Sequence, residues 1–225
     1  TTNPAAATRI EVVRGPATLL YGANAIGGLV NVISDDIPRE AVSGVHGSMS
    51  LDAGSAASEG AGAGNITIGN GELALNLNGS GRRAGSYGTP DGEIPNSFAR
   101  SGFGGAGLSW TGQNGFFGGS FSVDRTVYGV PLIEDGTTSL DPRRTNVNLR
   151  GERRNLNGFF TSVRGSFGVR RYRHDEREGE DEIASQFTNN QLEFDILGNH
   201  RPVGKLKGSV GAWALGRSFK VEGEE

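Results

Sequence analysis

The chain has 225 residues, a net charge of −3 and no cysteine, so a disulfide scaffold and a thiolate metal site are both excluded. So small a net charge gives no reason to expect a nucleic-acid partner. Thirty-eight glycines beside 35% hydrophobic residues are an odd balance for a soluble core, and no apolar run is long enough to predict a transmembrane helix.

Residues 9–34 read as a strand, a short helix and a second strand. β-branched side chains at 10–13 predict the first strand, and the apolar run at 29–33 predicts the second, buried one. Gly15 frees the backbone after the first strand, and Pro16 occupies the first turn of a helix predicted over 17–21. Glycines that follow are expected to end this helix and to let the second strand approach another backbone closely.

A charged stretch with a proline, residues 35–40, is the best domain boundary in the chain. We therefore predict an N-terminal domain segment over 1–37, a hinge over 38–40 and a β-rich domain over 41–225.

The β-rich domain is predicted from alternation of apolar and polar residues. In the segment 72–78 the three leucines share one face, and a slip of one residue would move every side chain to the other face. The predicted strands cover residues 41–53, 60–69, 72–84, 98–111, 115–128, 143–153, 158–174, 186–199 and 204–220.

The links between these strands alternate in length. Short turns are predicted near residues 70, 112–114, 155–157 and 200–203, and long loops over 54–59, 85–97, 129–142 and 175–185. Short turns at one rim and long loops at the other are typical of a transmembrane β-barrel.

His174, Asp175 and Glu176 open an acidic run in one predicted loop, and an imidazole beside carboxylates can capture a divalent cation. A mobile, solvated loop is the more common role of such a run, so the metal hypothesis is weak. No Ser/His/Asp arrangement or other catalytic spacing can be defended, so we expect neither an enzyme nor a cofactor.

The order of residues from 9 to 34 resembles the end of the plug domain of TonB-dependent outer-membrane receptors, with the pattern I-E-V-x-R-G-P followed by L-Y-G and A-x-G-G. The matching positions that define the motif are Glu11, Arg14, Gly15, Pro16, Tyr21, Gly22, Gly27, Gly28 and Asn31.

This resemblance implies a mostly β fold: the end of a small α+β plug followed by about nine strands of an antiparallel barrel of about 22 strands. The chain is accordingly expected to be a fragment, without the signal peptide, the TonB box or the final strands. Glu11 and Arg14 are expected to face the barrel wall, and the glycines to shape the backbone.

The resemblance also implies active uptake of a scarce ligand, such as a metal siderophore, haem, a metal ion or cobalamin, across the bacterial outer membrane. The expected partners are the TonB complex of the inner membrane, outer-membrane lipid and the small extracellular ligand. A passive porin or adhesin barrel and a soluble extracellular β-domain remain the alternatives, since both share alternating strands.

Overall fold

The computed structural model describes residues 9–15, 28–33, 36–131, 138–179 and 182–223. The chain forms two compact units, Thr1–Asp35 and Asp36–Glu225. In the described part no helix is long and apolar enough to cross a membrane.

The first unit contains an antiparallel pair, β1 (Arg9–Arg14) and β2 (Gly28–Ile33), which confirms the two predicted strands. The helix predicted between them lies outside the described residues. Gly28 has φ +132°, and a Cβ built there would lie 2.5 Å from the carbonyl oxygen of Val13. Only glycine therefore lets β2 begin this close to the end of β1.

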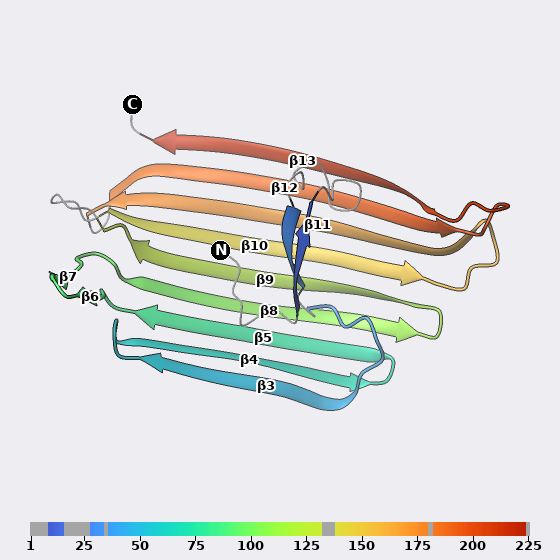
Figure 1. The fold of residues 1–225 in the computed structure, drawn as a ribbon, viewed down its shortest axis with the longest axis horizontal. Helices are drawn as coiled ribbons and strands as arrows, with labels where there is room; N and C mark the ends of the chain where they lie inside the picture. The colour runs from blue at the N-terminus through green and yellow to red at the C-terminus, as the bar shows by residue number, and fades with distance from the viewer. Residues whose placement is uncertain (1–8, 16–27, 34–35, 132–137, 180–181, 224–225) are drawn as a thin grey trace. The chain divides into compact units, whose positions relative to one another are not determined.

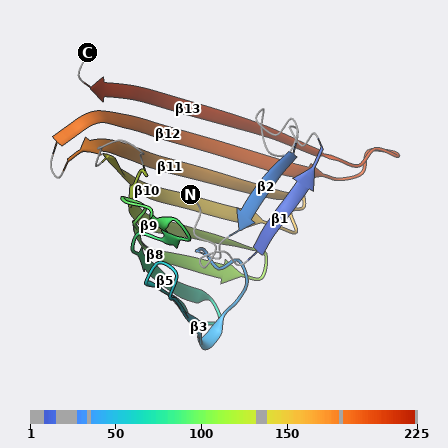
Figure 2. The ribbon, with the colours of Figure 1, turned by 60° about the vertical axis from the view of Figure 1, so that its left-hand side comes forward.

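The second unit is a nine-stranded antiparallel sheet in which each strand pairs with its neighbours in sequence (Figures 1 and 2). Figure 2 shows that the sheet curves across its width. Among the described residues only the small hairpin β6–β7 (Gly88–Thr89 and Gly92–Glu93) interrupts this order. The strands are β3 (Ser43–Gly54), β4 (Glu59–Asn70), β5 (Leu73–Ala84), β8 (Ala99–Gly112), β9 (Gly115–Gly129), β10 (Thr138–Arg153), β11 (Phe160–Glu178), β12 (Glu182–His200) and β13 (Ser209–Gly223).

The links agree only in part with the predicted alternation of length. At one rim, here called the turn rim, residues 71–72 and 113–114 form two-residue links, as predicted. At the opposite rim, the loop rim, the predicted loop over 175–185 is wrong for its greater part, because β11 extends to Glu178 and β12 begins at Glu182. The predicted start of β10 at residue 143 is also late, because this strand begins at Thr138.

The two faces of the sheet differ in polarity. Directly paired residues share a face, so the register places apolar side chains in rows across the strands. Phe121 and Leu192 in one such row are each 50% exposed. One row consists of Ile66, Leu77, Ala106, Phe121, Val147, Val169 and Leu192, and the next contains Ile68, Leu75, Leu108, Leu149, Phe167 and Phe194. We call this the apolar face.

The opposite, polar face carries small polar side chains that are buried. Asn76, Ser109, Ser120 and Ser122 are all less than a tenth exposed. A water-soluble sheet buries apolar side chains and exposes polar ones, so this arrangement is inverted. Such inversion is characteristic of a barrel that turns its apolar side toward lipid and its polar side toward a lumen.

The start of the second unit is seated on the polar face. Ile37 is 3% exposed, and a Cβ added at Gly118 would lie 2.5 Å from its Cγ2 atom. A Cβ at Gly107 would collide with the carbonyl oxygen of Asp36, and Asn78 donates a hydrogen bond of 3.3 Å to the Asp36 carboxylate. Because glycine has no side chain, Gly107 and Gly118 leave the space that Asp36 and Ile37, here called the linker, occupy on the polar face.

Gly107→Ala should destabilise the complete protein by about 1–3 kcal/mol, because the new methyl group displaces the linker from the sheet. Gly104→Ala is the matched control on the same strand, since a Cβ there meets nothing within 4 Å. Thermal unfolding in detergent measures both, and equal midpoints for the two variants would contradict the linker seat.

Candidate functional site on the polar face

Aromatic and basic side chains from neighbouring strands meet on the polar face near the loop rim. The register sets Arg144 of β10 opposite Tyr172 of β11, and His174 opposite Phe187 of β12. Tyr172 and His174 are two residues apart and therefore point to the same face. We call Arg144, Tyr172, His174 and Phe187 the aromatic cluster.

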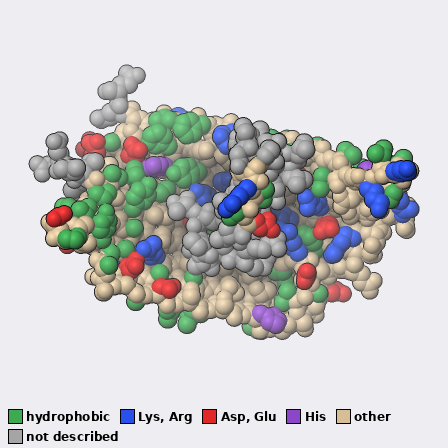
Figure 3. Space-filling view, viewed as in Figure 1, with side chains coloured by type: hydrophobic (Ala, Val, Ile, Leu, Met, Phe, Trp, Pro, Cys, Tyr) green, Lys and Arg blue, Asp and Glu red, His purple; other side chains and the backbone are tan. Residues whose placement is uncertain are grey.

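Contacts between rings and a cation connect this cluster. The Arg144 guanidinium carbon lies 5.8 Å from the centre of the Tyr172 ring, within range of a cation–π interaction. The hydroxyl of Tyr172 lies 3.3 Å from Nδ1 of His174, whose ring centre is 5.5 Å from that of Phe187. In Figure 3 hydrophobic side chains gather toward the end of the sheet at which β6 and β7 lie, with acidic side chains among them.

The cluster also has unused hydrogen-bonding capacity. Nε2 of His174 and Oδ1 of Asn189 are buried and have no hydrogen-bond partner among the described residues. Asn189 pairs directly with Tyr172, so both atoms belong to the same patch. Buried polar atoms are usually satisfied, and orphaned ones next to aromatic rings mark a place where a bound molecule can supply the partner.

A ladder of polar side chains continues from the cluster toward the turn rim. Asn146 donates to the hydroxyl of Ser122 at 3.1 Å, and Asn148 donates to that of Ser120 at 3.4 Å. Nε of Arg170 donates to Oδ1 of Asn146 at 3.2 Å. These amides and hydroxyls offer both donors and acceptors along the face and carry no charge. Such a surface is suited to contact with water or a polar solute.

The three residues of the predicted metal site do not converge. They lie in β11 rather than in a loop, so His174 and Glu176 share the polar face while Asp175 points to the other side. The Asp175 side chain is 1% exposed and accepts a 2.8 Å hydrogen bond from Nε of Arg173. Among the described residues no group of three His, Cys, Asp or Glu side chains could hold a metal ion.

The motif of the first unit is described only in part. Glu11 pairs with Asn31 and Arg14 with Gly28 across β1 and β2, and Gly15 has φ +90°. Pro16, Tyr21, Gly22 and Gly27 lie outside the described residues. The contacts of His174 with Tyr172 and Phe187, and of Tyr172 with Arg144, were not predicted from the sequence. The alternation R-Y-R-H was the signal that could have extended β11 through this segment.

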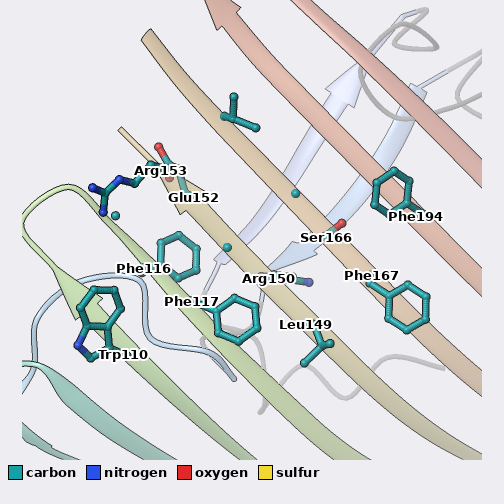
Figure 4. Close-up of a pocket in the computed structure, with 14 residues that line it drawn as sticks. Trp110, Phe116, Phe117, Leu149, Arg150, Glu152, Arg153, Ser166, Phe167 and Phe194 are labelled. Carbon is teal, nitrogen blue, oxygen red and sulfur yellow. The ribbon is translucent and has the colours of Figure 1, made fainter. Parts of the chain in front are cut away.

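A groove of about 550 Å³ lies among side chains of the apolar face (Figure 4). Trp110, Phe117, Leu149, Phe167 and Phe194 line it, and the directly paired Gly151 and Gly165 leave room at its floor. The side chains of the apolar face that line this groove suit contact with hydrocarbon better than contact with a polar solute.

Comparison with known proteins finds similarity for both units. The family model of the TonB-dependent Receptor Plug Domain matches residues 1–29. The fold is shared with the copper transporter OprC at TM-score 0.79 and 18% identity, over 93% of this chain and 33% of that one. It is also shared with the siderophore receptor PirA from Pseudomonas aeruginosa (TM-score 0.71, 17% identity, 98% and 37% covered).

A third structure with this fold is the ferric enterobactin receptor PfeA from Pseudomonas aeruginosa, solved with enterobactin. Its TM-score is 0.69 and its identity 16%, over 95% of this chain and 36% of that one. The chain thus spans about a third of the length of these proteins. At such identities the likeness establishes the fold, and the expected fold class is confirmed.

A double-mutant cycle on Arg144→Gln and Tyr172→Leu should give a coupling free energy of about 0.5–1 kcal/mol, because the guanidinium lies over the ring. Arg143→Gln is the matched control, since residue 143 points to the opposite face of the same strand. Unfolding midpoints of the complete protein in detergent give both couplings. Equal couplings for residues 143 and 144 would refute the contact.

Proposed function

We propose that this chain is part of a TonB-dependent receptor that takes up a scarce ligand across the bacterial outer membrane. In this proposal residues 1–37 are the end of the plug, 38–40 the hinge and 41–225 the first part of the barrel. The observation that carries it is the plug-domain match at residues 1–29, followed directly by a nine-stranded antiparallel sheet with an apolar outward face.

In such a receptor the two faces of the sheet contact different surroundings. The apolar rows contact outer-membrane lipid, and the polar face lines the lumen. The loop rim lies outside the cell, so the aromatic cluster meets the ligand first. Below the aromatic cluster, the ladder of amides and hydroxyls lets a ligand exchange one hydrogen bond for the next as it passes through the lumen.

The aromatic cluster supports a ligand class. A guanidinium binds anionic oxygens strongly, and aromatic rings stack on flat organic groups. Both features favour a metal held in an anionic organic chelate, such as a ferric siderophore or haem, over a free cation. The metal is then cargo, and its energy-driven release requires the inner-membrane TonB complex as partner. The structures that share the fold are named as transporters and receptors, which supports a function other than catalysis.

Cysteine accessibility tests the membrane placement, using single substitutions at Asn146 and Val147 in the complete protein in intact cells. The chain contains no cysteine of its own. A charged, membrane-impermeant maleimide should label Asn146→Cys at least about tenfold faster, because a thiol at residue 147 lies in an apolar row against hydrocarbon, where little thiolate forms. Equal labelling of the two variants would favour a water-soluble β-domain and would overturn the proposal.

Uptake assays test the ligand class. Cells that carry the complete receptor are supplied in turn with ferric enterobactin, haemin, cyanocobalamin and a Cu²⁺ salt, with and without a functional TonB. Arg144→Gln should weaken binding of an anionic chelate about tenfold, whereas Arg143→Gln on the opposite face should leave it unchanged. Uptake that persists without TonB would indicate a passive channel instead.

A further inference from the structure

The apolar face ends toward the loop rim in a row of arginines. On β9, β10 and β11 the register sets Arg125, Arg143 and Arg173 side by side. Each lies on the apolar face, because it is an even number of residues from an apolar row position on its own strand. The row between them and the apolar side chains consists of Val123, Thr145 and Arg171. Positive charge therefore begins directly where the apolar surface stops.

Two buried carboxylates hold these arginines in place. The Asp141 carboxylate is 1% exposed and accepts bonds of 2.8 and 2.7 Å from Nε and Nη2 of Arg125. Nη2 of Arg143 donates to the same carboxylate at 2.7 Å, and Nη2 of Arg177 lies 3.7 Å away. Asp175, also 1% exposed, binds Arg173 at 2.8 Å. We call Arg125, Arg143, Arg171, Arg173 and Arg177 the arginine array.

The array keeps an excess of positive charge after this pairing. Four arginines share the two carboxylates, and Arg171 is exposed without an ion-pair partner among the described residues. Asp141 occupies the Nε and Nη2 edge of Arg125, so the remaining N–H groups point away from it. Arg125, Arg143 and Arg173 are 56%, 44% and 46% exposed. These side chains are thus fixed in orientation and still open to an anion.

We propose that the arginine array binds the phosphate groups of a phosphorylated glycolipid in the outer leaflet of the membrane. This inference rests on the membrane orientation of the proposed function. Phosphate accepts paired hydrogen bonds from guanidinium groups, and the array lies at the level where headgroups follow hydrocarbon. The acyl chains of the same lipid lie against exposed Phe121 and Val147, which gives the lipid an advantage over free phosphate.

The test uses the complete receptor, purified free of lipid in detergent and titrated with bisphosphorylated lipid A, with bound lipid counted by native mass spectrometry. The double variant Arg125→Gln/Arg171→Gln should bind lipid A about tenfold more weakly. It leaves Arg143 on Asp141 and Arg173 on Asp175, so neither buried carboxylate loses all its partners. The matched control is Arg170→Gln, next to residue 171 on the polar face, which should bind as the unmodified receptor does.

Arg171→Gln alone keeps every described ion pair and should still weaken lipid A binding several-fold. This single variant therefore tests the inference even if the double variant does not fold. Dephosphorylated lipid A, phosphatidylglycerol and inorganic phosphate distinguish the source of the anion, and each should bind at least about tenfold more weakly than lipid A. Equal binding by any of them, or no loss in the variants, would overturn the inference. Labelling of Val147→Cys separates this failure from that of the proposed function. A receptor that protects residue 147 from the maleimide but does not bind lipid A refutes only the inference.

Discussion

The structure depends on one constraint: alternation of side chains combined with a register that keeps apolar residues in the same rows from β4 to β12. Because directly paired residues share a face, an apolar position on one strand meets an apolar position on the next, as with Phe121, Val147 and Val169. A slip of one residue in a single strand would place charged side chains in this row and apolar ones beside Ser120. Everything else, from the polar ladder to the arginine array, follows from which residues are odd and which are even.

The linker uses the same alternation in another way. Gly107 and Gly118 both lie on the polar face, where a side chain at either position would fill the space that Asp36 and Ile37 occupy. The glycine content that looked odd for a soluble core thus has a local explanation in a face that must admit another backbone. The groove at Gly151 and Gly165 on the apolar face arises from the same absence of side chains, but among aromatic neighbours.

The existence of the nine strands and their pairing in sequence order could be predicted from periodicity and turn residues. Their ends near the loop rim could not. Pro142 argues against a strand, yet β10 passes through it, because Asp141 and Pro142 are skipped in the pairing with β9 and the ladder resumes at Arg143. The acidic run from Asp175 was interpreted as solvated, whereas the Asp175 carboxylate is buried and paired with Arg173 on the same strand, and Arg177 lies 3.7 Å from Asp141 on the neighbouring strand. Such pairing depends on register, which local sequence does not reveal.

The segment from Arg171 to Arg177 shows why neither candidate surface could be recognised from the sequence. Read continuously, it is a mixed charged run without evident chemistry. Separated by parity, its odd positions place Arg171, Arg173 and Arg177 with Asp175 on the apolar face, and its even positions place Tyr172 and His174 on the polar face. One side gathers charge that suits phosphate, and the other gathers rings that suit an organic chelate. A single extended strand can therefore belong to two recognition surfaces with different chemistry. A substitution at one residue can alter one surface while its immediate neighbour acts only on the other.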